Sequence, residues 1–496
     1  TTNDLTNVII GEVVEDKTVT TTALNTRGNI DTGVSKDVPL VIANNSNNDI
    51  DIIIGVASGY VGNTITYGSN GYPKGTKINN TYNSSDITNS CASKIDTSGT
   101  DCTKKIVNGH LITYCPVEDV ELQEDPSGAN RPVLAEGMIP ITYDGTNWVK
   151  ADQYGAYNDW YDYGNQKWAN AVMVTSSKRD TYMNADIGTI IPENDILAYF
   201  VWIPRYKYKL FNASYANGTS PQVIDVTFEN GTSTTGTVTC TYASNGAETC
   251  QNKANGNWFT HPAFTFGDTE VKGIWVGKFG TTGSTTIPTV KPGISALNII
   301  STEMSSMYNT GLSFRSANYL TSNGVNQADS HMMKNIEWGA VAYLKQSNYG
   351  LGITDITINS NSSYYTGGGT GTSYKTNTSQ STTGNITGVY DMSGGAFEYV
   401  MGNIKKQSGN SGLTPSGVPA EHIDIYSGTS VSASHLGDAI GETAGWYSDY
   451  VDFTGYWVCR GGHYSYGDSA GIFSFGHGGI GAYTGFGFHL VLTVVE

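Results

Sequence analysis

Short β-branched and apolar runs, separated by clusters of Asn, Asp, Gly and Ser, constrain the fold of this chain most strongly. Residues 8–10, 18–22 and 38–42 are such runs, and a longer one, residues 52–57, is still only strand-length. Charged residues make up 14% of the chain, against about 25% in an average soluble domain. Thr, Ser and Asn fill the deficit, and they favour turns and strand surfaces over helices. The pattern predicts a β-rich α+β fold.

The length of 496 residues predicts two to four domains, at roughly 100–200 residues each. The runs of residues 1–118 favour a sandwich-like β domain that serves as an accessory or spacer. A boundary is expected near residues 125–128, where Asp-Pro-Ser-Gly forms a turn signal. We expect residues 119–195 to connect this domain to a larger one, residues 196–496.

Two hairpins are predicted in the connecting region. Residues 137–143 and 147–150 flank Asp-Gly-Thr, and residues 160–163 and 167–170 flank Gly-Asn-Gln. Both arrangements predict a turn between strands with aromatic cross-strand neighbours. We expect their tryptophans to pack in a core rather than to bind a ligand.

The larger domain begins with two predicted strands, residues 198–206 and 273–279. Residues 330–344 carry apolar side chains at 332, 333, 336, 340, 341 and 344, which is helical spacing. Ser330 would be the N-cap of this helix.

Charge and hydropathy exclude some partners. The formal charge of −17 and the pI near 4.8 argue against nucleic-acid binding, because a phosphate backbone would be repelled. No run of about 18 apolar residues is present. The chain begins Thr1-Thr2-Asn3 without an initiator Met, so we expect that an upstream segment was removed. Any membrane, pilus or particle anchor would lie in that segment.

The six cysteines are too few for a disulfide scaffold. Cys240 and Cys250 flank a tight Asn-Gly turn, so they are expected to face each other across a hairpin. Such a pair points to an oxidising compartment, and no cysteine spacing matches a zinc site. The other cysteines are Cys91, Cys102 and Cys115, in one loop-rich region with room for one pair, and Cys459, which stands alone.

The C-terminal segment, residues 460–488, has the composition of a binding loop. It contains ten glycines, three tyrosines, three serines and two histidines, and only Arg460 and Asp468 are charged. Tyr supplies rigid amphipathic contact area, while Ser and Gly supply adaptable hydrogen bonds and loop shapes, as in antibody binding loops.

Five segments in order resemble the domain of the formylglycine-generating enzyme family, which has a C-type-lectin-like fold. They are residues 198–206, residues 273–279, Ile336-Glu337-Trp338-Gly339-Ala340, residues 388–399, and Arg460-Gly461-Gly462-His463 with Gly487-Phe488-His489. The resemblance covers residues 196–496. It implies the fold, but a fold alone does not give an activity.

The enzymes of that family use a pair of copper-binding cysteines in the C-terminal region. This chain has only Cys459 there, and a lone thiol cannot supply a two-thiolate soft-metal site. We therefore expect no catalytic residues and no enzyme. The resemblance also makes Asp391 and Glu398 hydrogen-bonding scaffold residues.

A second group with this fold resembles the chain more closely, namely the variable proteins of diversity-generating retroelements. In that group a C-terminal segment is rewritten at adenine positions, and its side chains display a ligand-binding surface on a constant scaffold. The resemblance implies that Tyr464, Tyr466, His477 and Tyr483 anchor a ligand and that Ser465, Asp468 and Ser474 adapt to it. The variable candidates are His463, Tyr464, Ser465, Tyr466, Asp468, Ser474, Phe475, His477, Ile480, Ala482 and Tyr483.

The sequence thus predicts an extracellular, cell-surface or phage-particle protein that binds a protein or glycan on another cell or host surface. Structural calcium is compatible with this fold class, and no other cofactor or metal site is expected because the histidines are scattered. Three alternatives remain: a fixed-sequence lectin, a pilus or phage-fibre subunit, and a formylglycine-generating-type oxidase.

Overall fold

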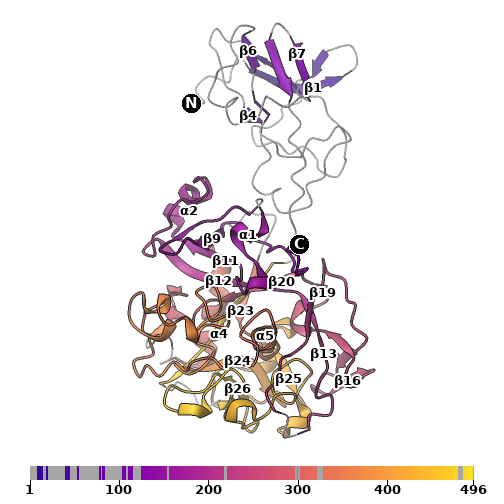
Figure 1. Cartoon of the computed structure of the whole chain (residues 1–496), viewed down its shortest axis with the longest axis vertical. Helices are drawn as coiled ribbons and strands as arrows, with labels where there is room; N and C mark the ends of the chain where they lie inside the picture. Colours follow the sequence, from indigo (N-terminus) through magenta and orange to yellow (C-terminus); the bar gives the residue numbers. More distant parts are fainter. Residues whose placement is uncertain are drawn as a thin grey trace. The chain divides into compact units, whose positions relative to one another are not determined.

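Two compact units divide the chain in the computed structural model, Thr1–Glu121 and Leu122–Glu496 (Figure 1). The structure describes residues 125–153, 156–216, 220–296, 299, 302–320, 328–478 and 484–494, and within residues 1–124 it describes the strands β1 to β8. The division lies close to the boundary expected near residues 125–128.

The first unit contains short strands, in keeping with the β-branched runs of its sequence. Antiparallel pairing gives the strand orders β2-β1-β3 and β6-β8-β7, and β4 pairs with β5. Cys91, Cys102 and Cys115 lie outside the described residues. The strands are β1 (Val8–Val14), β2 (Thr18–Thr20), β3 (Leu40–Asn44), β4 (Ile53–Ile54), β5 (Ile78–Asn79), β6 (Thr81–Asn83), β7 (Thr103–Val107) and β8 (His110–Tyr114).

A seven-stranded antiparallel sheet organises the second unit. The expected connecting region 119–195 is not separate, because its strands β9, β10 and β11 belong to the same sheet as β12. In spatial order the strands are β10 (Trp148–Lys150), β9 (Ile139–Tyr143), β11 (Asn170–Val174), β12 (Ile196–Pro204), β20 (Gly273–Gly277), β29 (Leu490–Val494) and β23 (Ala328–Met332).

The first predicted hairpin is confirmed and the second is wrong. β9 and β10 pair across the turn at Asp144, as expected. The second turn instead folds as a short 3-10 helix, Tyr163–Asn165, in which the Asp162 carboxylate accepts a hydrogen bond from the Asn165 amide and Gln166 adopts φ 54°. This local side-chain cap competes with strand pairing, so only an isolated bridge joins Asp162 to Lys167.

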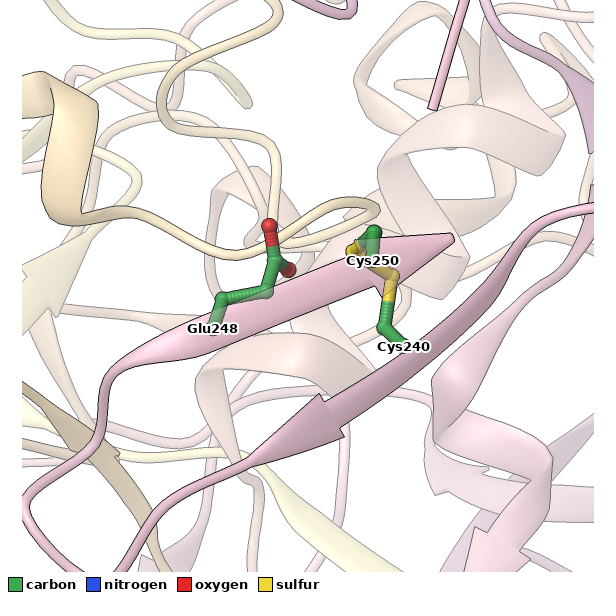
Figure 2. Close-up of side chains that lie close together, drawn as sticks. All are labelled: Cys240, Glu248 and Cys250. Carbon is green, nitrogen blue, oxygen red and sulfur yellow. A yellow bond between two sulfur atoms is a disulfide. The ribbon is translucent and has the colours of Figure 1, made fainter. Parts of the chain in front are cut away.

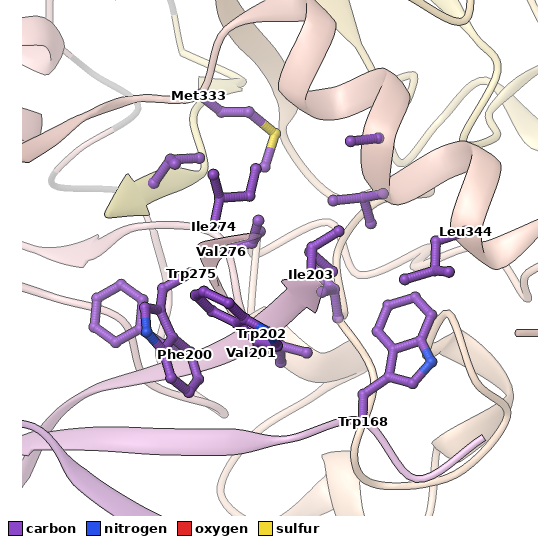
Figure 3. Close-up of a cluster of buried hydrophobic side chains, with 14 of the residues drawn as sticks. Trp168, Phe200, Val201, Trp202, Ile203, Ile274, Trp275, Val276, Met333 and Leu344 are labelled. Carbon is purple, nitrogen blue, oxygen red and sulfur yellow. The ribbon is translucent and has the colours of Figure 1, made fainter. Parts of the chain in front are cut away.

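Aromatic side chains fill the core beneath this sheet. Trp202 and Trp275 lie opposite each other on β12 and β20, with ring centroids 5.2 Å apart (Figure 3). Trp148, Trp160 and Trp168 are also buried, which confirms that the tryptophans of the 137–170 region pack in a core. Such aromatic pairs add about 0.5–1.5 kcal/mol beyond their burial.

Helix α5 (Asn335–Lys345) lies in the middle of the second unit, where all of its residues are buried (Figure 1). The helix predicted at 330–344 exists, but its start is wrong. Ser330 lies on β23, where its hydroxyl donates to the Gly311 carbonyl, and Met332 pairs with Leu490 of β29. The N-cap is instead Lys334, whose backbone amide donates a hydrogen bond to the Glu337 carboxylate in the first turn.

A second sheet carries the C-terminal segment. Its strand order is β25-β24-β26-β27, and β28 pairs in parallel with β24. Together the two sheets and few helices confirm a β-rich α+β class. The strands are β24 (Phe397–Ile404), β25 (Asp424–Tyr426), β26 (Trp457–Arg460), β27 (Phe475–Gly478) and β28 (Phe486–Gly487).

Smaller elements surround these sheets. No helix among the described residues has the length and apolar character needed to cross a bilayer. The smaller strands are β13 (Tyr206–Lys209), β14 (Val226–Phe228), β15 (Thr239–Tyr242), β16 (Glu248–Gln251), β17 (Trp258–Thr260), β18 (Thr265–Phe266), β19 (Thr269–Glu270), β21 (Thr282–Gly283) and β22 (Pro288–Thr289). The helices are α1 (Tyr157–Trp160), α2 (Ser176–Met183) and α4 (Met304–Leu312).

The predicted cysteine hairpin is confirmed. Cys240 on β15 and Cys250 on β16 are cross-strand partners joined by a disulfide (Figure 2). Glu248 precedes Cys250 by two residues on β16, and its carboxylate accepts hydrogen bonds from the Leu436 amide at 2.7 Å and the Tyr215 hydroxyl at 2.9 Å. These bonds hold the hairpin against the loop at Leu436.

Candidate functional site

The C-terminal segment starts at Arg460, whose guanidinium is fully buried at the end of β26. Its Nη2 donates to the carbonyls of Ala439 at 2.9 Å and Ile472 at 3.3 Å, and the group lies 5.7 Å from the Trp338 ring. Burial lowers the pKa of Arg460 to about 10, so the group stays charged at neutral pH. Arg460 therefore ties the segment to α5 and to the loop at Ala439.

Glycines allow the backbone after Arg460 to turn closely on itself. Gly461 and Gly462 have φ of 83° and 73°, values that glycine adopts without strain. A Cβ on Gly462 would lie 2.6 Å from Ala470 Cα, and one on Gly471 would lie 2.2 Å from both carboxylate oxygens of Asp449. Packing therefore restricts Gly461, Gly462, Ala470 and Gly471.

The variable candidates differ in exposure. Ser465, Tyr466, Asp468 and His477 are exposed, whereas His463 and Tyr464 are half-buried. Tyr466 exposes 41% of its surface, the largest fraction among the tyrosines that the structure describes as exposed. Ile480, Ala482 and Tyr483 lie outside the described residues.

Two candidates are wrong as ligand contacts, because Ser474 and Phe475 are each 0% exposed. The Ser474 amide donates to the Gly471 carbonyl at 2.9 Å, which closes a tight turn and directs the chain into β27. Phe475 begins that strand and packs near the ring of Phe453, 6.2 Å away. Both side chains belong to the scaffold.

The exposed and half-buried candidates form one continuous group of rings. The His463 ring lies 4.2 Å from that of Tyr464 and 5.8 Å from that of Tyr466. Tyr466 in turn lies 5.8 Å from the ring of Tyr450, a residue in the loop before β26. The His463 Nδ1 is 2.8 Å from the Ser465 hydroxyl, and burial lowers the pKa of this histidine.

A carboxylate connects this group to His477. Asp452 Oδ2 lies 2.9 Å from His477 Nδ1 and accepts a hydrogen bond from the Tyr450 hydroxyl at 3.2 Å. We call His463, Tyr464, Tyr466, Tyr450, Asp452 and His477 together the aromatic surface. It combines flat apolar faces with hydroxyl, imidazole and carboxylate groups, which suits sugar stacking or a protein epitope.

Tyr450, Asp452 and Tyr364 were not expected from the sequence. Tyr364 supports the surface from below, with its hydroxyl 3.0 Å from His463 Nε2 and its ring 5.3 Å from that of Tyr464. Tyr364 is distant from the segment in sequence and reaches it through the packing of the 359–366 loop. Tyr450 and Asp452 lie shortly before the segment, and the bridge between Val451 and Phe475 holds them against it. No composition signal marks them.

Asp391 and Glu398 are buried scaffold residues, as the resemblance implied. Asp391 accepts hydrogen bonds from the amides of Gly367 and Gly280 and from the Asn359 side chain, and Glu398 pairs with His489. Burial raises the pKa of both carboxyl groups. They line a cavity of about 20 Å³, which is room for about one water molecule.

This carboxylate pair does not fit the structural calcium that the fold class suggests. Calcium takes six to eight oxygen ligands, whereas the oxygens of Asp391 already face N–H donors and Glu398 faces an imidazole. We therefore place no calcium at this pair.

The only thiol among the described residues is Cys459, which is buried on β26. Burial raises its pKa well above the usual range, so the thiolate needed for copper binding or nucleophilic attack is disfavoured. Cys240 and Cys250 form a disulfide with each other and therefore offer no free thiol.

Comparison with known proteins does not assign the chain to a family. No protein-family model matches the chain, and no curated protein matches it.

Proposed function

We propose that this chain is a non-enzymatic ligand-binding protein whose second unit has a C-type-lectin-like fold and whose aromatic surface binds the ligand. The observation that carries the proposal is the sorting of the C-terminal segment by exposure. Tyr466 and His477 present their side chains to solvent, while Arg460, Ser474 and Phe475 between and before them are buried. A surface that can change without disturbing its support is what a diversified binding protein requires.

Two further observations support the proposal. The five segments that resemble the formylglycine-generating enzyme family fall on β12, on β20, on α5, on the loop that leads into β24 with the start of that strand, and on the run from the end of β26 to the start of β29. The disulfide between Cys240 and Cys250 supports an extracellular or cell-surface location, because disulfides persist in oxidising compartments.

The ligand in this proposal is a protein or glycan on another cell. Tyr450 and Tyr466 are the anchors best placed for it, since 40% and 41% of their surfaces are exposed and their rings lie 5.8 Å apart. Aromatic anchors of this kind dominate binding energy at many interfaces.

Binding of wild-type protein to a glycan array and to intact bacterial cells tests the ligand class. We expect the double variant Tyr450→Ala/Tyr466→Ala to lose at least about tenfold in affinity for whatever the wild type binds. Ile287→Ala is the matched control, because Ile287 is 66% exposed and lies outside the aromatic surface. A double variant that binds like the wild type would refute the proposed surface.

The neighbouring DNA tests diversification separately. We expect a reverse-transcriptase gene and a template repeat that differs from the coding sequence of residues 460–488 at adenines. If both are missing from the locus, the surface is that of a fixed lectin or a fixed pilus or fibre subunit.

A further inference from the structure

Asp329, His331 and His422 lie together although the two histidines are far apart in sequence. Asp329 and His331 are two residues apart on β23, so their side chains lie on the same face of the strand. His422 ends a short 3-10 helix, Ala420–His422. In the sequence these histidines look scattered. The cluster forms only when the loop that carries His422 packs against β23.

The inner ring nitrogens of both histidines converge on one oxygen. His331 Nδ1 is 2.8 Å and His422 Nε2 is 2.9 Å from Asp329 Oδ1. One ligand atom from each of the three residues lies within 4.8 Å of the others. In a tetrahedral zinc site, with bonds of about 2.0–2.1 Å, neighbouring ligand atoms lie about 3.3 Å apart. The two distances from the imidazole nitrogens to Asp329 Oδ1 therefore need to lengthen by only about half an ångström around such an ion.

The outer ring nitrogens are held by other groups. His331 Nε2 lies 3.0 Å from Glu337 Oε1, and His422 Nδ1 lies 3.1 Å from the Tyr308 hydroxyl. Metal-binding histidines almost always donate their second N–H to a carboxylate or another acceptor, which fixes the tautomer and orients the ring. Glu337 and Tyr308 supply that support for both rings.

The surroundings favour a borderline metal ion and leave it a path to solvent. Both imidazoles are buried, and the Phe266 ring lies 5.6 Å from His331 and 5.9 Å from His422. The Asp329 side chain keeps 18% of its surface exposed, and its second oxygen contacts Arg315, whose side chain is 50% exposed and can move aside. Two imidazoles and one carboxylate suit Zn²⁺ better than Ca²⁺, which prefers oxygen ligands only.

We propose that Asp329, His331 and His422 form a Zn²⁺ site in which the ion joins β23 to the 420–422 helix. Three protein ligands leave a fourth position for solvent at the exposed edge of Asp329. In this proposal the ion fixes the loop that follows β24 against the edge strand of the seven-stranded sheet.

Zinc titration of the full chain after removal of metals by a chelator tests the site. We expect isothermal titration calorimetry to show an ion that binds the wild type with a Kd of about 1 μM or tighter. His422→Gln and Asp329→Asn, which keep size and polarity, should each lose that event or weaken it at least about tenfold. Co²⁺ in place of Zn²⁺ should give tetrahedral absorption bands in the wild type that are absent from both variants.

A variant of Tyr308, which supports the His422 ring, provides a test that does not depend on replacing a ligand in the cluster. Tyr308→Phe removes only the hydroxyl that contacts His422, and it should weaken zinc binding about tenfold or more, as outer partners of metal ligands generally do. His477→Gln is the matched control, because it disrupts another His–carboxylate pair, that with Asp452, at which no third possible ligand converges among the described residues. It should bind zinc like the wild type.

Two results would overturn the zinc site. One is a wild-type chain that binds no zinc at micromolar concentrations. The other is equal zinc affinity in the wild type, His422→Gln, Asp329→Asn and Tyr308→Phe, which would place any bound ion elsewhere in the chain. In either case the cluster is a hydrogen-bonded network alone, with His331 bridging Asp329 and Glu337.

Discussion

At the scale of single residues, two serines of the same segment occupy opposite environments. Ser465 is exposed and Ser474 is fully buried, with no hydrogen-bond partner for its hydroxyl among the described residues. Composition cannot separate them, because both stand among glycines and aromatics. The difference arises from the turn at Gly471, which directs the chain at Ser474 inward.

Replacing each serine by tyrosine should show this difference. Ser474→Tyr inserts a large ring into a packed site, and overpacking costs about 1–3 kcal/mol or more in free energy of unfolding. Ser465→Tyr adds the same ring on the surface and should change stability by less than about 0.5 kcal/mol. Urea denaturation measures both, and equal losses would contradict the assigned environments.

Asp449 should make stability depend on pH. Its Oδ2 accepts a hydrogen bond from the Phe473 amide at 2.9 Å, whereas its Oδ1 has no partner among the described residues. Burial, together with nearby Asp355, raises the pKa of Asp449 to about 8. The folded state therefore keeps a proton that the unfolded chain, with its ordinary pKa of 3.8, has lost.

The sign follows from this difference in bound protons. Stability should fall as the pH rises from about 4 to about 8, by at most about 1.4 kcal/mol per pH unit from this group. Asp449→Asn should flatten that slope, although buried Asp438 and Glu442, whose pKa values are raised to about 8 and about 7, act in the same direction and remain. Thermal unfolding of the wild type and of Asp449→Asn at several pH values measures this slope. A slope unchanged by the substitution would show that Asp449 is ionised in the folded state.

At the scale of elements, helix α5 packs closely against the loop at Gly437, and the contact is made at Gly339. A Cβ at this position would lie 1.9 Å from the Gly437 carbonyl oxygen, which also lies 2.9 Å from His261 Nε2. The loop at Gly437 leads to Ala439, which accepts from Arg460. The helix thus positions the scaffold of the aromatic surface through this loop.

Gly339→Ala should therefore destabilise the protein, even though alanine favours a helix by about 1 kcal/mol over glycine. We expect a net loss of about 2 kcal/mol or more, because neither backbone can move without breaking hydrogen bonds. Gly417→Ala is the control, since a Cβ there meets no atom within 4 Å. Chemical denaturation of both variants measures the free energy of unfolding. An unchanged value for Gly339→Ala would mean that the loop at Gly437 can move away from the helix at little cost.

Elements were predictable where local pattern and tertiary pairing agree. Strands β12 and β20, the β9–β10 hairpin and the cysteine hairpin follow directly from apolar runs and turn residues. The start of α5 was not predictable, because Met332 and Met333 continue the helical spacing although Met332 pairs with β29. A strand pairing over a long sequence distance overrides local periodicity in such cases.

At the scale of the whole molecule, the second unit combines a fixed sheet with a surface built on its neighbour. β29 lies inside the seven-stranded sheet, while the loop before β26, the loop between β26 and β27, and β27 itself carry the aromatic surface. The chain therefore returns to the sheet after displaying the variable candidates, which anchors both ends of the segment. The sequence identified the segment, but the contributions of Tyr450 and Asp452 depend on contacts that only folding creates.

The central claim is that the exposed positions vary freely on a scaffold set by the buried ones. Two libraries displayed on yeast with the full chain test it directly. One randomises His463, Tyr464, Ser465, Tyr466, Asp468 and His477, and the control library randomises residues 470–475. Each is measured for protease resistance and then for binding to lysozyme as an arbitrary target.

Most members of the surface library should resist protease at the concentration that the parent survives, and selection should yield lysozyme binders with a Kd of about 1 μM or tighter. Most members of the control library should be degraded, because they disturb a buried framework. A surface library that is degraded as often as the control, or that folds and yields no binder, would contradict the account.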